Sequence, residues 1–420
     1  MTFSRTPAIP TRGRAAEAAH WRRGAALLAA CLPLWAGAHG TATEPVPDEV
    51  GLRAGVAAAV TYLRADAVLP SARLDGFVLQ GDEGVDRRRW GLEHGVLDVG
   101  WRFHPQWAAY AAVGKHDSDR PHTEAFWLQV RQPQGDATWL LSAGRQRPAL
   151  GAVLETAGHF DRFSQVPLAQ RATLNGSWID DGVQLGWRGE VAGRPVALDA
   201  GLWRGQVFPG ARQGSAVPAL HVGTQVGDVA IDAVAARFAP RGRGRGTRTS
   251  SFGAGHSHAA PICDDSTRGQ VACFDGHSDL AAASARWQSP DWPLTVSAAG
   301  WLRRDRGDVA SGNGSARYRS TQRGGWLEGV WQFHPQLEAG LRVERLQARH
   351  ALSGPGAALL ASELRLNRYR PAQRTVWMLG YTPRPGLDVR LELGRESVAG
   401  QRVRYAMLRA LWQFDTQLAP

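Results

Sequence analysis

Histidines, cysteines and aspartates gather in one polar segment, residues 240–277, in a pattern that could bind a metal ion. His256 and His258 are two positions apart, and His277 ends the segment. Imidazole nitrogens combined with a carboxylate suit Zn²⁺ or Cu²⁺. The sequence therefore raises zinc or copper capture by this segment as one hypothesis. The alternative is a polar loop that binds nothing.

The same segment contains two cysteines, Cys263 and Cys273. In an exported chain, two cysteines so close together predict a disulfide within a loop. Metal ligation by their sulfurs is the less favoured alternative.

A second group of charged residues could select solutes by charge. These residues are Arg145, Arg147, Glu155, His159, Asp161, Arg162 and Arg171. All but Arg145 belong to the long polar connection 147–179. Opposed acids and arginines can narrow a channel and exclude ions of one sign. The sequence therefore predicts a pore constriction here, with an ordinary solvated loop as the alternative.

Alternation with a period of two residues is the main structural signal that would position these groups. In 337–344 and again in 387–394, leucine, valine and one alanine alternate with charged residues or glycine. Such segments are strands with one apolar face. A soluble β-sandwich would alternate in the same way.

The connections favour a membrane barrel over a sandwich. Seven short turns, such as 104–106 and 334–336, alternate with long polar connections that include 147–179, 240–277, 304–322 and 348–370. Short turns on one side and long loops on the other are typical of outer-membrane barrels. The sequence predicts an all-β, transmembrane, antiparallel up-and-down β-barrel of about sixteen strands in 71–414, with 71–80 as the first strand and 401–414 as the last.

Aromatic residues at predicted strand ends support this assignment. They are Trp101, Phe103, Trp331, Phe333, Tyr381, Trp412 and Phe414. Aromatic girdles mark the two interfaces of a membrane barrel. The repeated sequence Trp-x-Phe-His-Pro-Gln at 101–106 and 331–336 indicates one hairpin design used twice.

The first 38 residues have the pattern of a cleaved signal peptide. Arginines precede a short apolar run, and Ala36-Gly37-Ala38 provides a cleavage site. Lipid attachment at Cys31 is the less favoured alternative. Residues 39–70 are expected to form a periplasmic segment, a plug or an early strand, and 415–420 a C-terminal tail. The signal peptide and the predicted barrel together indicate that the chain is exported to the bacterial outer membrane.

Arginine dominates the positive charge. The chain has 49 basic residues, of which only Lys115 is lysine, and a formal net charge of +11. We expect anionic solutes, outer-membrane lipid and lipopolysaccharide as partners, and no nucleic acid because the chain is exported. The predicted lumen-facing arginines are Arg131, Arg188, Arg342 and Arg390, and acids such as Asp199 and Glu338 share their faces.

Three stretches resemble the phosphate-selective porin O/P family. They are Arg-Arg-Arg-Trp-Gly-Leu-Glu at 87–93, Ala-Gly-Arg-Gln-Arg-Pro-Ala-Leu-Gly at 143–151 and Asp-Gly-Val-Gln-Leu-Gly at 181–186. The resemblance implies a trimeric sixteen-stranded channel whose third long loop folds into the lumen. Family members use lysines at their binding zone, whereas this chain has almost none, so phosphate specificity does not follow.

Together these patterns predict a porin for passive diffusion and ion transport, with anions preferred and loop 147–179 narrowing the lumen. A metal-capturing porin that uses 256–277 and a secreted soluble β-protein are the alternatives. We expect no enzyme activity because the sequence has no G-x-S-x-G elbow and no H-E-x-x-H motif. No resident cofactor is expected apart from Zn²⁺ or Cu²⁺ in that loop.

Overall fold

The computed structural model describes residues 45–69, 74, 87–116, 120–155, 160–174, 176–244, 263, 271–364, 366 and 371–418. The predicted signal peptide, residues 1–38, lies outside these ranges. Among the described residues, no helix combines the length and the apolar character needed to cross a bilayer.

In the part of the chain that the structure describes, there are seventeen strands and two short helices. The strands are β1 (Gly51–Ala65), β2 (Arg88–His104), β3 (Trp107–Lys115), β4 (His122–Gln134), β5 (Ala137–Gln146), β6 (Asp180–Val191), β7 (Arg194–Trp203), β8 (Val217–Val226), β9 (Val229–Phe238), β10 (Arg243–Gly244), β11 (Cys273–Gln288), β12 (Leu294–Ser311), β13 (Gly314–His334), β14 (Leu337–Ser353), β15 (Ala372–Arg384), β16 (Leu387–Val398) and β17 (Gln401–Leu418). The helices are α2 (Leu168–Leu174) and α3 (Ala357–Glu363).

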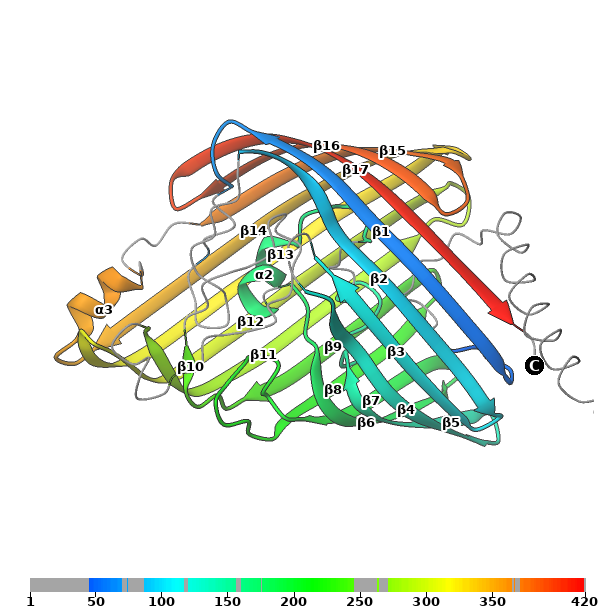
Figure 1. Cartoon of the computed structure of the whole chain (residues 1–420), viewed down its shortest axis with the longest axis horizontal. Coiled ribbons are helices and arrows are strands. Elements are labelled where there is room, and N and C mark those ends of the chain that lie inside the picture. Colours follow the sequence, from blue (N-terminus) through cyan, green and yellow to red (C-terminus); the bar gives the residue numbers. More distant parts are fainter. Residues whose placement is uncertain are drawn as a thin grey trace, which may run out of the picture. The chain divides into compact units, whose positions relative to one another are not determined.

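The strands form a closed antiparallel barrel (Figure 1). Each strand pairs with its neighbour in the chain, except that β9 pairs with β11, and β1 closes the ring by pairing with both β17 and β2. The two-residue strand β10 pairs only with β11 and stands outside the ring. The barrel therefore has sixteen strands, as the sequence predicts.

Side-chain burial is inverted relative to a water-soluble protein. Apolar residues such as Trp101 and Leu393 are 52% and 51% exposed on the outer face, whereas the inward-facing Arg303 and Asp305 are completely buried. Lipid-facing apolar residues that alternate with inward polar residues are the pattern of transmembrane barrels. The apolar face of each strand therefore points outward, and the polar face points into the barrel.

The repeated Trp-x-Phe-His-Pro-Gln sequence forms the same turn in both places. In each copy the histidine Nδ1 accepts a hydrogen bond of 3.2 Å from the backbone N–H two residues later, at His104 and at His334. The preceding aromatic pairs, Trp101 with Phe103 and Trp331 with Phe333, lie on the outer face next to these turns. The interpretation of one hairpin design used twice is therefore confirmed.

The first strand is β1, which corrects the prediction of 71–80. Because β1 pairs directly with both β17 and β2, no place is left in the ring for another strand between them. Of 71–80 only Leu74 is among the described residues, and it is not in a strand. The inward face of β1 contains alanine and leucine besides Arg53 and Thr61, so its alternation of polar and apolar residues is weak.

Other strand boundaries also differ from prediction. The range 304–322 is not a loop but the distal part of a hairpin, because β12 continues to Ser311 and β13 begins at Gly314. Its outward residues Arg304, Arg306 and Arg319 are exposed, so no apolar face marks it as strand. The last strand, β17, extends past Phe414 to Leu418 and takes in most of the predicted tail.

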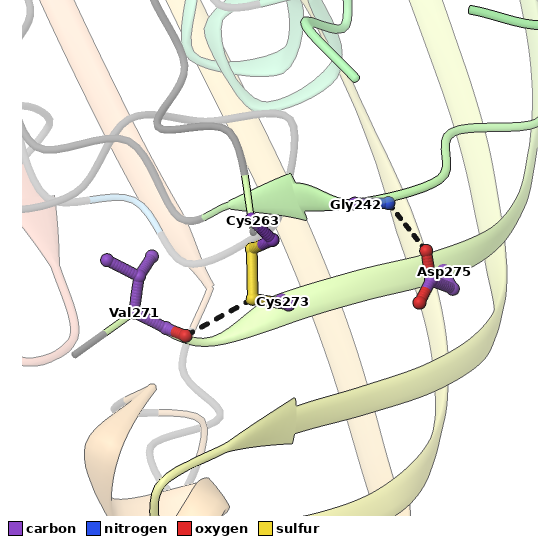
Figure 2. The surroundings of a disulfide bond; sticks show 5 residues. All are labelled: Gly242, Cys263, Val271, Cys273 and Asp275. Atoms are coloured by element: carbon purple, nitrogen blue, oxygen red, sulfur yellow. Dashed lines mark hydrogen bonds between the residues drawn. A yellow bond between two sulfur atoms is a disulfide. The ribbon is translucent and has the colours of Figure 1, made fainter. Parts of the chain in front are cut away.

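The predicted disulfide is present between Cys263 and Cys273 (Figure 2). It joins residue 263 to the first residue of β11. Nearby, the backbone N–H of Gly242 donates to Asp275 Oδ1 at 2.5 Å, and that of Cys263 donates to the carbonyl of Gly242 at 3.1 Å. These contacts fasten the described ends of the 240–277 segment to the rim of the barrel.

Arg53 stabilises the closing strand from inside the barrel. Its guanidinium lies 3.2 Å from Asp98 on β2 and 3.4 Å from Asp415 on β17. A Cβ at Gly55 would come within 2.2 Å of Asp98 Oδ1, so glycine there leaves room for the ion pair. One buried arginine thus connects the strands on both sides of β1.

Arg53→Ala is expected to lower the free energy of unfolding by about 3–5 kcal/mol, because removing one member of a buried ion pair leaves the other charge uncompensated. Guanidinium unfolding of the detergent-folded protein, followed by tryptophan fluorescence, measures the change. Arg64→Ala is the matched control, since Arg64 lies on the exposed outer face of the same strand. Equal stability of the two variants would contradict this role for Arg53.

Candidate functional site

The segment 147–179, between β5 and β6, folds into the interior of the barrel. All seven residues of α2 within it are buried. The helix contacts β12, β13, β14 and β15, and Figure 1 shows it enclosed by the strands. A helix buried on every side is enclosed by protein, and here these strands and other residues of the same segment, such as Leu154 and Trp178, cover it. The segment therefore takes up part of the lumen.

Apolar contacts attach the first and last parts of the segment to one side of the wall. Leu150, Leu154 and Trp178 belong to a buried cluster with wall residues that include Trp203 and Trp301. Burial of side chains of this size contributes about 1.5–3 kcal/mol each. The cluster fixes where the segment leaves β5 and where it returns to β6.

A row of arginines attaches the middle of the segment to the other side of the wall. We call Arg303, Arg342, Arg374, Arg390 and Arg409 the arginine row; they come from β12, β14, β15, β16 and β17. Each donates to backbone carbonyl oxygens of the segment, at residues 161, 165, 166, 172 and 173. Hydrogen bonds from charged donors contribute about 1.5–3 kcal/mol each.

Carboxylates on the wall complete this attachment. Glu344 Oε2 accepts from the backbone N–H of Leu168 at 2.7 Å, and Glu344 Oε1 lies 2.8 Å from Arg342 and 2.9 Å from Arg374. Glu392 Oε1 accepts from both the backbone N–H and the hydroxyl of Ser164, at 2.6 and 2.7 Å. The arginines and acids therefore neutralise one another while they position the segment.

The residues predicted to form the constriction occupy different environments. Arg145 is in phase with the outward-facing Trp139 and Leu141 on β5 and pairs with Asp181 at 2.8 Å, so its side chain does not face the lumen. Gly144, with φ of +134°, immediately precedes it. Arg147 is exposed, and His159 lies outside the described residues.

The remaining constriction candidates lie on the inserted segment. Glu155 accepts from the backbone N–H groups of Leu150 and Gly151, at 2.7 and 3.1 Å. Asp161 contributes its carbonyl oxygen to Arg390 and Arg409 of the arginine row. Arg162 is exposed and lies 3.5 Å from Glu338, and Arg171 is buried within α2. Among the described members of this group, Arg162 combines an exposed charged side chain with an acidic partner on the wall, Glu338.

The predicted lumen-facing arginines all have partners. Arg342 and Arg390 belong to the arginine row. Arg188 pairs with Asp199 at 2.9 Å. Arg131 donates to the carbonyl oxygens of Asp48 and Pro105, at 3.2 and 3.0 Å, and so attaches the chain before β1 to the wall. These arginines act first as structural donors.

The predicted metal loop is only partly described. His256 and His258 lie outside the described residues. His277 is exposed and alternates with the inward-facing Ser278 on β11, which places its ring on the outer face. Capture of zinc or copper by this loop stays a prediction.

Sequence reasoning missed Arg303, Arg374 and Arg409 of the arginine row, although each lies in a strand assigned to the barrel. Strand phase alone could have placed these three inside, but nothing in the sequence indicates which carbonyl groups they contact. It also missed His94 and Glu124, which lie together on the inner face of the barrel wall.

No protein-family model matches the chain, and no curated protein matches it. The resemblance to the phosphate-selective porin O/P family is therefore not confirmed.

Solved structures of outer-membrane proteins are similar to this barrel along most of its length. A loop L8 deletion mutant of OmpT from Vibrio cholerae has a TM-score of 0.53 and 13% identity, covering 87% of this chain and 99% of its own. OmpF of Salmonella typhi, in a complex with daunomycin, has a TM-score of 0.52 and 8% identity, covering 87% and 98%. At such low identity the likeness concerns the fold alone. The chain has the closed sixteen-stranded barrel fold that outer-membrane porins have.

Proposed function

We propose that this protein is an outer-membrane porin through which small solutes diffuse passively. The observation that carries the proposal is the segment 147–179, attached from both sides inside a closed sixteen-stranded barrel. A barrel of this size leaves an aqueous channel unless it is filled. A firmly attached internal segment narrows such a channel to a fixed cross-section. The largest solute that can pass is then determined by the space that the segment leaves in the lumen.

A preference for anions is the finer part of the proposal. The excess of arginine over acidic residues supports it. The internal pairing of the arginines limits it, because a paired guanidinium attracts a passing anion less than an unpaired one does. We therefore expect weak anion selectivity, and no phosphate specificity.

Location and assembly belong to the same proposal. The N-terminal signal pattern and the apolar outer face support secretion to the bacterial outer membrane, with lipid and lipopolysaccharide as neighbours. One of the similar structures is an in-vitro folded trimer form of OmpT, with a TM-score of 0.52 and 12% identity, covering 87% of this chain and all of its own. We propose that this chain also forms a homotrimer.

The purified protein in planar lipid bilayers is expected to give stable single-channel steps. Under a KCl gradient, the reversal potential should show chloride as modestly more permeant than potassium, because the net charge is positive. Absence of channel steps from correctly folded protein would contradict the porin function. Cation selectivity would contradict only the anion preference.

The double variant Arg374→Gln/Glu344→Gln is expected to increase conductance or open-channel noise. It removes one donor and one acceptor that attach the segment, yet keeps the net charge of the chain unchanged. Single-channel recording measures both quantities.

The control for this variant is Arg188→Gln/Asp199→Asn, which removes a more exposed wall pair whose arginine donates to strand groups and not to the segment. We expect wild-type noise from it. Equal behaviour of the two double variants would show that the attachment of the segment does not limit the channel.

A further inference from the structure

Three histidines and one glutamate converge inside the wall, at the end of the barrel where β3 passes into β4. They are His94, His116, His122 and Glu124, here called the histidine–glutamate cluster. The imidazole Nε2 atoms lie 2.7, 3.7 and 3.6 Å, in that order, from the same glutamate oxygen, Oε1. The ligand atoms of His94, His116 and Glu124 all lie within 4.8 Å of one another, and His122 approaches them on the side of Glu124.

Two β-bulges build the cluster. The register of β2 against β1 shifts at Glu93, and that of β4 against β3 shifts at Glu124. A bulge adds one residue to a strand and redirects the side chains next to it. As a result His94 and Glu124 both turn into the barrel, on strands that flank β3.

Glycine on the strand between them provides the space. A Cβ at Gly114 on β3 would lie 2.2 Å from Glu124 Oε1 and 2.7 Å from His94 Nε2. The imidazole of His116, directly after β3, stacks on that of His94 with 4.2 Å between ring centroids. The cluster thus occupies a cradle that any larger residue at 114 would fill.

Hydrogen bonds at the far side of two rings determine which nitrogen faces the cluster. His116 Nδ1 lies 3.2 Å from the carbonyl oxygen of Glu93, and His122 Nδ1 lies 3.1 Å from that of Arg120. A carbonyl oxygen only accepts, so each Nδ1 carries the proton and each Nε2 offers an electron pair. Metal-binding histidines are oriented in this way by their second nitrogen.

We propose that the histidine–glutamate cluster binds one divalent transition-metal ion, for which Zn²⁺ is the best match. Three imidazole nitrogens and one carboxylate oxygen form a four-ligand set that zinc prefers. Two ligands of a tetrahedral zinc, each at about 2.0–2.1 Å, would be roughly 3.3 Å apart, close to the separations at His116 and His122. The ligand atoms of His94, His116 and Glu124 already lie within 4.8 Å of one another. A small shift at His94 and an approach of the His122 ring would complete the set.

An ion could reach the cluster through His122, and its binding would connect two strands. The side chain of His122 is 21% exposed, whereas those of His94 and His116 are almost fully buried. The ring of His94 also stacks on Phe160 of the inserted segment, with 5.3 Å between centroids. A bound ion would join β2 to β4 next to that segment.

Isothermal titration of the chelator-treated, detergent-folded full-length protein with Zn²⁺ tests the proposal. We expect one ion per chain and a visible spectrum of tetrahedral Co²⁺ on titration with cobalt. Glu124→Gln and His122→Ala should each weaken binding by at least about tenfold, since even changes to the partners of metal ligands cost about 10- to 100-fold. His122→Ala is included because its partly exposed ring makes loss of folding less of a concern.

His334→Ala, at an exposed turn far along the chain, is the control and should bind as the wild type does. Heat-modifiable migration on SDS gels establishes that each variant is folded. No uptake of Zn²⁺ by folded wild-type protein would overturn the proposal. So would loss of binding in His256→Ala/His258→Ala together with full binding in Glu124→Gln, which would place the metal in the 240–277 segment instead.

Discussion

Antiparallel pairing of β1 with β17 is the interaction on which the rest of this structure depends. A strand edge left open in a bilayer would expose backbone polar groups that no lipid can satisfy. Closure removes that edge and separates two environments, a lipid-facing surface and an enclosed polar interior. Only inside such an enclosure can a buried residue like Arg303 or Arg374 find enough partners to be tolerated.

The number of strands and the positions of the turns could be predicted because the outer face is regularly apolar. The short turns contain proline, glycine and aspartate. The first strand could not, because alanines such as Ala57 and Ala59 on its inner face resemble those on its outer face. The distal part of the β12–β13 hairpin, 304–322, could not be told from a loop, since its outer residues, among them Arg304 and Arg306, are charged. Both errors arise where one face of a strand lacks its usual composition.

The candidate site was harder to predict than the fold. The sequence predicted the bounds of the connection, 147–179, yet the contacts of this segment with the wall depend on strands more than a hundred positions away, as with Ser164 and Glu392. The histidine–glutamate cluster depends on two bulges, and a bulge reverses the inward and outward phase without a signal in residue type. Contacts of this kind become visible only once register is known.

The arginine row contacts the inserted segment through backbone carbonyl groups, which every residue possesses whatever its side chain. Side chains of that segment can therefore change during evolution without loss of these contacts, provided that its path is kept. The wall residues have no such freedom, because each guanidinium must reach a defined carbonyl. The side chains that the segment presents inside the barrel can thus diversify among descendants of this protein while the arginines of the wall stay the same.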